Sequence, residues 1–370
     1  MKSMFLLSHT PIPRFIKKIN IASEVSQTKL LYWDRKLKND VKFTVGSGVV
    51  CESIELKAPI GKTLKRSLTL IIFLFKSLKI IKKYGPNNLH VGNLDMLLIA
   101  FIYKTLFNKD VKIIYEIGDL PEIIFKSNIF GRLYKNLEKA LMKKVDFLIL
   151  SSSFFWEVYY KQFTDYEKYI YIPNVPSISM AKTPFKKRIN QEFNNENLTI
   201  GFIGSIRYEQ QLKMLFDEVM YNGKINLLVA GTGMKVKELK KYTSKSKNIK
   251  FTGPYDYKEI GYLYSNVDII YSVYDTDKEN VKIALPNRLY ESLLFEKPLI
   301  VSKNTELANF VLEHNIGFEV SDKSPEDLRK ILTSILRDEK LLKEKQKHCN
   351  AIKKNYTYEA YIPKIKALYR

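Results

Sequence analysis

Short apolar runs alternate with longer stretches of helical periodicity through most of the chain. This alternation is typical of parallel strands joined by crossover helices. In the first half it predicts strands at Ser3–Ser8, Lys42–Val45, Asn88–Val91, Lys112–Glu116, Phe147–Ser151 and Tyr169–Ile172, and helices at Asn93–Phe107 and Ile129–Lys144. We therefore expect an α/β domain built on a parallel sheet.

The periodicity stops between about Pro173 and Asn197, where prolines, a basic cluster and an Asn/Glu-rich stretch predict a linker. The alternation then restarts, with strands expected at Leu198–Ile203, Ile225–Ala230, Ile249–Thr252, Asp268–Ser272 and Pro298–Ser302, and helices beginning at Gln211, Lys235, Tyr257, Asn287 and Pro325. We expect domains at 1–175 and 198–352, a linker at 176–197, and a terminal helix within 353–370 that packs back on the first domain.

A basic amphipathic helix is expected at Lys62–Lys83. Its apolar residues recur at helical spacing, at Leu64, Leu68, Ile71, Phe75 and Leu78. Lys and Arg are scattered over the remaining positions. A crossover helix covering the first sheet and a helix lying on a membrane surface both present this pattern. The sequence leaves the two open.

The bulk composition fits a folded protein of two domains. The chain has 370 residues, of which 45% are hydrophobic and 13% aromatic, which is enough to build real cores. Cys51 and Cys349 are far apart and have no metal-ligand spacing, so we expect neither a disulfide framework nor a zinc site, and a reducing cytoplasm as the compartment. The start lacks a signal-peptide pattern, and no apolar run reaches the ~18 residues of a membrane span.

The chain is strongly basic, with 61 Lys and Arg against 39 Asp and Glu, a formal charge of +22. Such a field attracts phosphates, nucleotides, nucleic acid or anionic lipid. The basic residues are dispersed and no nucleic-acid reader module is present, so we expect no nucleic-acid partner.

The most informative segment is Ala284–Val301, which reads ALPNRLYESLLFEKPLIV. Pro286 marks the start of a helix, whose first-turn N–H groups and dipole form a phosphate site, and Arg288 adds a permanent cation. Asn287 and Glu291 share a helix face, where the Glu291 carboxylate can accept hydrogen bonds from ribose hydroxyls. The alternative is an acid that faces solvent near a helix start.

This segment resembles the donor-binding helix of the family 4, group 1 glycosyltransferases, which have the two-Rossmann-domain GT-B fold with a cleft between the lobes. Further segments are similar to motifs of that family, in the same order and nearly end to end: Phe5–Arg14, His90–Asp95, Tyr115–Glu122, Leu198–Arg207, Leu227–Gly233, Asn248–Pro254 and Ile260–Asp268. The resemblance implies a nucleotide-sugar site on the second domain and an acceptor site on the first.

The resemblance also assigns roles. Donor binding falls to Gly204, Arg207, Gln210, Gly231, Gly253, Asn287, Arg288 and Glu291, with the arginines on the diphosphate, Glu291 on the ribose and the Gly253 loop on the base. The acceptor side has Asp119, His90 and Arg14 as catalytic candidates and His9 as a lesser one. His9 and His90 lie at strand ends, where the alternative is a structural role as hydrogen-bonded polar residues.

The resemblance implies that the protein transfers a sugar from a nucleotide diphosphate and retains the anomeric configuration. It also implies that the reaction needs no metal and no cofactor beyond the donor. We expect a UDP-sugar, although Glu291 does not distinguish UDP from GDP. The expected acceptor is a lipid-linked saccharide in capsule or surface polysaccharide synthesis, so the protein is expected to be cytoplasmic and peripheral to an anionic inner membrane face, where each well-placed Lys or Arg adds ~1 kcal/mol.

Three positions depart from the family pattern: Ile283 stands where an acid is usual, Gln210 where a Lys is common, and Gly118 where a His precedes the Asp. Asp275-Thr-Asp277 has the spacing of a metal-binding motif of other glycosyltransferases, with a solvated loop as the alternative. Trp156 can stack on a sugar or pack in the core. Rival classes are a nucleotide-sugar epimerase or hydrolase on the same fold, and an inactive nucleic-acid- or membrane-binding homologue.

Overall fold

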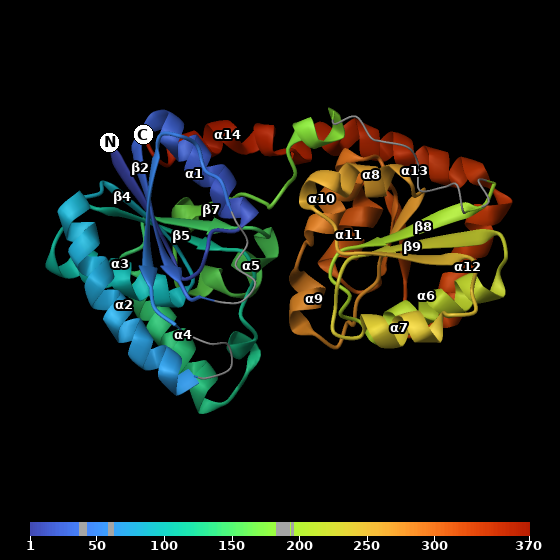
Figure 1. Cartoon of the computed structure of the whole chain (residues 1–370), viewed down its shortest axis with the longest axis horizontal. Coiled ribbons are helices and arrows are strands. Elements are labelled where there is room, and N and C mark those ends of the chain that lie inside the picture. The colour runs from blue at the N-terminus through green and yellow to red at the C-terminus, as the bar shows by residue number, and fades with distance from the viewer. Residues whose placement is uncertain (37–42, 58–62, 183–192, 194–195) are drawn as a thin grey trace. The chain divides into compact units, whose positions relative to one another are not determined.

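The computed structural model describes residues 1–36, 43–57, 63–182, 193 and 196–370, with the backbone alone for residues 63–67. The chain forms two compact units (Figure 1). One consists of Met1–Pro173 together with Tyr361–Arg370, and the other of Asn174–Ala360. Each unit is an α/β sandwich with its own parallel sheet, as the alternating pattern predicts.

The first unit contains a seven-stranded sheet in the order β3-β2-β1-β4-β5-β6-β7, with every neighbouring pair parallel. Its strands are β1 (Lys2–Leu7), β2 (Gln27–Asp34), β3 (Val49–Glu55), β4 (Asn88–Gly92), β5 (Lys112–Ile117), β6 (Phe147–Leu150) and β7 (Tyr169–Tyr171). The central strands are buried on both faces, which explains their mostly apolar sequences.

Helices cover both faces of this sheet. They are α1 (Pro13–Val25), α2 (Thr63–Tyr84), α3 (Leu94–Leu106), α4 (Ile129–Met142) and α5 (Ser153–Val158), with short 3-10 helices at Glu122–Phe125, Tyr160–Gln162 and Tyr166–Lys168. The strand order reverses beyond β1, and right-handed crossovers then place α1 on one face and α2, α3 and α4 together on the other. In agreement, α2 packs on α3 and α3 packs on α4 (Figure 1).

The second unit contains a six-stranded parallel sheet in the order β10-β9-β8-β11-β12-β13. Its strands are β8 (Leu198–Ile203), β9 (Ile225–Ala230), β10 (Ile249–Gly253), β11 (Ile269–Ser272), β12 (Leu299–Ser302) and β13 (Gly317–Val320). Its helices are α6 (Glu209–Tyr221), α7 (Val236–Tyr242), α8 (Ile260–Ser265), α9 (Glu279–Ile283), α10 (Asn287–Leu294), α11 (Glu306–Glu313), α12 (Pro325–Arg337) and α13 (Glu339–Ile352), with 3-10 helices at Ile178–Lys182, Tyr257–Glu259 and Lys353–Tyr356.

The last helix, α14 (Tyr358–Ala367), ends on the first unit. Ile365, Leu368 and Tyr369 are buried there, and Lys366 pairs with Glu24 of α1 at 2.7 Å. Residues 353–360, which we expected to begin the returning segment, group with the second unit instead. No helix in the described ranges is both long and apolar enough to cross a membrane.

One predicted strand is wrong. Phe43–Val45 of the expected strand Lys42–Val45 has no regular structure, and Lys42 lies outside the described residues. The strands that occupy this part of the sheet are β2 and β3, and the pattern did not reveal them because their polar residues interrupt the apolar run. The helix expected at Lys62–Lys83 is present as α2.

Candidate functional site

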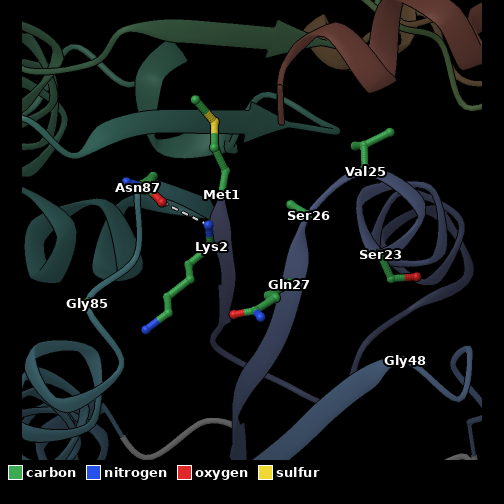
Figure 2. A pocket seen from close by; sticks show the side chains of 9 residues that line it. All are labelled: Met1, Lys2, Ser23, Val25, Ser26, Gln27, Gly48, Gly85 and Asn87. Atoms are coloured by element: carbon green, nitrogen blue, oxygen red, sulfur yellow. Dashed lines mark hydrogen bonds between the residues drawn. The ribbon is translucent and has the colours of Figure 1, made fainter.

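Two surface hollows lie at the amino ends of the strands. One is lined by Lys2, Gln27 and Asn87, at the starts of β1, β2 and β4 (Figure 2). The other is lined by Leu198 and Asp268, at the starts of β8 and β11. Ligands of open α/β sheets bind beyond the carboxyl ends of the strands. The candidate site residues follow that opposite edge in both units, so we build the site there.

In the second unit, glycines bring the loops after β8, β9 and β10 into close contact. Gly204 donates its N–H to the Ala230 carbonyl at 2.9 Å, and Gly231 donates to the Gly253 carbonyl at 2.8 Å. Gly231 has φ +134°, and a Cβ at this position would lie 1.9 Å from the Gly204 carbonyl oxygen. Only glycine fits such an approach. The predicted glycines therefore let three loops form one edge of the sheet.

Arg288 places a buried cation at this edge. It is the second residue of α10, and its guanidinium lies over the ring of Phe202 at 4.3 Å and near that of Tyr274 at 5.5 Å. Nη1 donates to the Tyr271 carbonyl at 3.4 Å, and a Cβ on Gly204 would lie 2.6 Å from Nη2. Two aromatic rings and one carbonyl hold the guanidinium, which leaves its positive charge without a carboxylate partner among the contacts described.

Glu291 lies one turn further along α10 and is buried. The alternative of a solvent-facing acid is therefore wrong. Its two carboxylate oxygens each accept one hydrogen bond at 3.1 Å, from the hydroxyls of Tyr257 and Tyr264. The two tyrosine hydroxyls thus hold the carboxylate in one orientation.

Tyrosines of the loop after β10 complete this cluster, and the sequence motifs did not single them out. Burial and the negative charge of Glu291 raise the pKa of Tyr255 to about 12, while Arg288 acts in the opposite direction. Burial and the same carboxylate also raise the pKa of Tyr257. These phenols are therefore neutral hydrogen-bond donors at neutral pH. The recurrence of Tyr after Gly253 was the one signal available for them.

Three other predicted donor-site residues lie on the surface. Arg207, in the loop after β8, and Gln210, at the start of α6, are exposed. Asn287 is exposed at the start of α10 and accepts a hydrogen bond from Asn174 Nδ2 at 3.0 Å. All three follow the carboxyl edge of the sheet, but only Arg288 and Glu291 of the charged candidates are buried in it.

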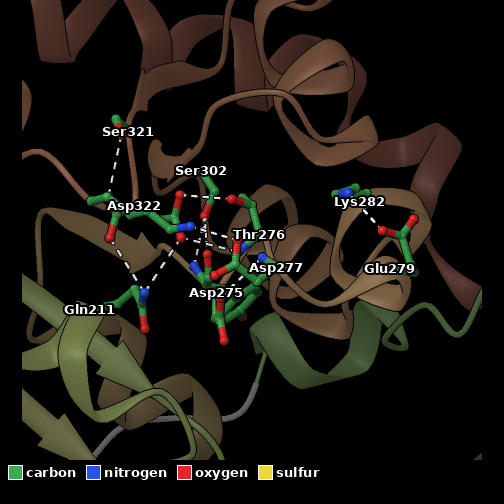
Figure 3. Close-up of polar contacts among 11 residues, drawn as sticks. Gln211, Asp275, Thr276, Asp277, Glu279, Lys282, Ser302, Ser321 and Asp322 are labelled. Carbon is green, nitrogen blue, oxygen red and sulfur yellow. Dashed lines mark hydrogen bonds and ion pairs between the residues drawn. The ribbon is translucent and has the colours of Figure 1, made fainter. Parts of the chain in front are cut away.

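The loop Asp275-Thr-Asp277 is held by hydrogen bonds (Figure 3). Asp322 accepts from Thr276 N at 3.0 Å and Thr276 Oγ1 at 2.8 Å, and Gln211 donates to Asp322 Oδ2 at 3.4 Å. The Asp277 carboxylate pairs with Lys323 at 2.5 Å, which lowers its pKa. Within the described residues, no three His, Cys, Asp or Glu side chains gather as a metal site. This arrangement is that of a structured loop.

In the first unit, Glu116 at the end of β5 is the centre of a buried polar cluster. It pairs with Lys18 Nζ at 3.1 Å, with Arg14 Nε at 3.6 Å and with His90 Nε2 at 3.0 Å. Burial by itself raises the pKa of the Glu116 carboxyl, but Lys18, His90 and Arg14 together bring it well below its usual range. Lys18, which the motifs missed, is buried on α1, and burial lowers its pKa despite Glu116. The carboxylate is ionised and shared by surrounding donors.

His90 is fully buried and has both ring nitrogens engaged. Nε2 bonds Glu116, Nδ1 lies 2.6 Å from the Tyr369 hydroxyl, and the ring stacks on Phe5 with centroids 4.6 Å apart. Burial lowers the pKa of His90, with the hydrogen bond to Glu116 acting against it. We therefore interpret His90 as a positioning residue that joins the C-terminal segment to Glu116. His9 lies nearer the surface, where its Nδ1 donates to the Thr10 carbonyl at 2.7 Å.

Arg14 fills the space beside Gly118. A Cβ added to Gly118 would lie 1.0 Å from Arg14 Nη1. The Arg14 guanidinium can thus lie here only because position 118 has no side chain. Asp119 follows Gly118 and is exposed. Trp156 is buried and stacks on Tyr169 with centroids 5.1 Å apart, so it belongs to the core.

The architecture of the chain, two parallel α/β units with charged residues at the carboxyl edges of both sheets, defines the GT-B class of glycosyltransferase folds. Two solved structures are similar over nearly the whole chain. Sucrose-phosphate synthase of Thermosynechococcus elongatus has a TM-score of 0.73 at 14% identity, covering 100% of this chain and 98% of that one. HepE of Anabaena in complex with UDP has a TM-score of 0.73 at 15% identity, covering 99% and 98%. At these identities the similarity establishes the fold.

Residues 184–356 match the model of the family described as glycosyl transferases group 1. These matched residues lie within the second unit. Among curated proteins it is similar to the succinoglycan biosynthesis protein ExoL of Rhizobium meliloti (strain 1021), at 25% identity over 264 residues. That match covers 67% of this chain and 63% of the relative's length.

Proposed function

We propose that the protein transfers a sugar from a UDP-sugar to a saccharide acceptor. The observation that carries this proposal is the placement of Arg288 and Glu291 on α10: a buried cation without a carboxylate partner in its described contacts lies one turn from a buried carboxylate that two tyrosine hydroxyls orient. A guanidinium suits a diphosphate, and a carboxylate suits the hydroxyls of a ribose. HepE, whose structure contains UDP, supports the choice of nucleotide.

In the proposed reaction the bond between the sugar carbon and the departing phosphate oxygen breaks while the oxygen of an acceptor hydroxyl bonds to that carbon, and the hydroxyl proton passes to the departing phosphate. Negative charge builds on the phosphate, and a preorganised cation and backbone N–H groups stabilise it. Arg288 and the first turn of α10 would supply this stabilisation. We further propose that the reaction retains the anomeric configuration and needs no metal ion, as the family resemblance implies.

The proposed acceptor is a lipid-linked saccharide of a surface polysaccharide, at the cytoplasmic face of a membrane. ExoL supports this choice, since its name assigns it to succinoglycan biosynthesis. On the first unit, we propose Arg14 and Asp119 as the groups that contact the acceptor, with Glu116 and His90 positioning Arg14.

A transfer assay tests the proposal. The protein would be incubated with radiolabelled UDP-sugars and a polyprenyl diphosphate saccharide, and label would be measured in the organic extract. We expect Arg288→Ala to lower kcat/KM for transfer about 100-fold, because a charge-assisted contact is lost. Arg337→Ala, which removes an exposed arginine of α12, is the matched control and should leave kcat/KM unchanged. Equal activity of Arg288→Ala and wild type contradicts the proposed donor site.

A further inference from the structure

Helix α4 exposes its apolar stripe to solvent. Ile129, Phe130, Leu133 and Leu137 have exposed fractions between 43% and 67%. At 100° per residue they span one continuous face of the helix. Surface helices normally turn such a stripe toward the core. The apolar face of α4 is therefore available for a partner.

Buried contacts fix α4 in this orientation. Glu138, on the opposite face, is buried and accepts hydrogen bonds from the hydroxyls of Tyr115, Tyr159 and Tyr160 at 2.7 to 3.0 Å. Gly131 lies so close to the preceding turn that a Cβ would be 2.2 Å from the Lys126 carbonyl oxygen. Rolling α4 to bury its apolar stripe would expose three tyrosine hydrogen bonds and break this packing. The exposed stripe is a fixed feature of the fold.

Helix α2 repeats the same arrangement. Phe73, Ser77 and Ile81 face inward, and Phe73 stacks on Trp33 with centroids 5.0 Å apart. The outward face carries large apolar residues with exposed fractions between 49% and 68%: Leu68, Ile71, Ile72 and Phe75. The sequence left open whether this helix covers the sheet or lies on a surface. In the structure, one face of α2 packs inward and the opposite face is exposed.

Cations accompany both stripes. The outward face of α2 continues as Lys76, Lys79, Lys82 and Lys83, all exposed, and the flank of the α4 stripe carries exposed Arg132, Lys139 and Lys143. Along α2 there is no acidic residue, and the only acid of α4 is the buried Glu138. Where side chains are described, the outward faces of the two helices are thus apolar and cationic apart from the neutral Asn136, and they carry no acid.

The two stripes belong to one surface, because α2 and α4 lie in the same layer of helices, on either side of α3 (Figure 1). The end of α3 adds exposed Leu106 and Phe107, and Lys82 lies over the Phe107 ring at 5.1 Å. We call these outward faces of α2 and α4, with the end of α3, the helical face.

We propose that the helical face docks on a bilayer containing anionic phospholipid, with the apolar stripes entering the headgroup and acyl boundary and the Lys and Arg side chains pairing with lipid phosphates. Charge complementarity carries the choice of partner: large apolar side chains interleaved with cations and no exposed acid suit a negatively charged apolar surface. The inference deepens the proposed function, since a lipid-linked acceptor resides in such a bilayer.

Vesicle co-sedimentation tests the inference without any substrate. The probes are vesicles of phosphatidylcholine mixed with phosphatidylglycerol and vesicles of phosphatidylcholine alone. We expect wild type to bind the mixed vesicles, and Leu133→Gln/Leu137→Gln to bind about tenfold more weakly, because two leucines no longer transfer from water. Leu312→Gln, which changes an exposed leucine of α11 in the second unit, is the matched control and should bind as wild type does.

The outcomes separate the inference from the proposed function. Unchanged binding by the double variant, or binding of wild type equally to both vesicles, overturns the inference. Loss of a wild-type dimer in the double variant, seen by analytical ultracentrifugation, also overturns it, because the helical face would then bind a second copy. The thermal shift caused by UDP is measured on every variant. A retained shift without vesicle binding by wild type refutes the proposed membrane surface alone. Absence of the shift in all variants, with vesicle binding intact, refutes the proposed donor site alone.

Discussion

Arg14 and Gly118 occupy one small volume at the end of β5, and each determines the other. The guanidinium lies where the Gly118 side chain would be, and Glu116 holds it there. Gly118 has no left-handed backbone to strain, so an alanine at this position acts only through the collision with Arg14. Gly118 therefore offers a way to move Arg14 without changing its charge.

We predict that Gly118→Ala lowers kcat/KM for transfer about 10- to 100-fold, as Arg14→Ala does, because both remove one charge-assisted contact. The double variant should be no worse than either single variant, since both changes act on the same guanidinium. A double-mutant cycle on kcat/KM measures this. Additive losses, or full activity of Gly118→Ala, exclude the coupling.

Glu116 gives a pH dependence of stability whose sign follows from its pKa. The folded pKa lies below the unfolded value of about 4.3. The carboxylate thus stabilises the fold above that pH, and the stabilisation is lost as the pH falls toward the folded pKa. Glu116→Gln should cost about 3–5 kcal/mol at pH 7, because Lys18 is left buried without its partner. Its deficit against wild type should shrink in acid.

Urea unfolding of both proteins at neutral and acidic pH measures that deficit. Glu24→Gln, which removes an exposed partner of Lys366, is the control and should show little change at either pH. A deficit that is constant with pH, or that grows in acid, contradicts the assigned ionisation of Glu116.

Most interior strands were predictable from sequence, as were the edge strands β7 and β10, but the interior strand β2 and the edge strands β3 and β13 were not. The interior strands β1, β4, β5, β8 and β9 are mostly apolar, because two layers of helices cover them. Strands β3 and β13 lie at sheet edges and carry polar residues, so their patterns are weak. The apolar residues of Phe43–Val45 have the pattern of a strand, but this segment does not pair with the sheet.

For the site, residues of one local motif could be identified from sequence, and residues brought together by long-range contacts could not. Arg288 and Glu291 could be singled out from sequence because they lie within one turn of a helix whose start the sequence marks. Lys18 and the tyrosines around Glu291 were not, since only the fold brings α1 to β5, and α8 to α10. Long-range contacts of this kind leave no local pattern.

The C-terminal segment is an element whose contribution can be measured separately. Tyr369 is fully buried in the first unit and its hydroxyl bonds His90. We predict that Tyr369→Ala costs about 3–5 kcal/mol by cavity formation, and that Tyr369→Phe costs about 1–2 kcal/mol through the lost hydrogen bond. Hydrogen exchange should become faster at β1 and β4 while β9 of the second unit keeps its protection. Faster exchange in both units alike contradicts this placement of the segment.

At the scale of the whole molecule, two sheets of one topology class present different chemistry at their carboxyl edges. The second unit offers a buried cation and a tyrosine-held carboxylate, suited to a nucleotide diphosphate. The first offers a buried carboxylate that orients an arginine, and a helical face of apolar and cationic side chains. The net charge of +22 favours phosphate-bearing partners of both units.

The donor site of the second unit is the central claim, and thermal unfolding with UDP, GDP and ADP, and with their sugar conjugates, tests it most directly. A ligand at 100 times its Kd adds about 2.7 kcal/mol to the free energy of unfolding. We predict that UDP and UDP-sugars stabilise wild type and the control Glu313→Gln, and that Glu291→Gln loses most of the shift, because a ribose contact is weakened roughly 10- to 100-fold. No shift with any nucleotide, or an equal shift in Glu291→Gln, contradicts the donor site.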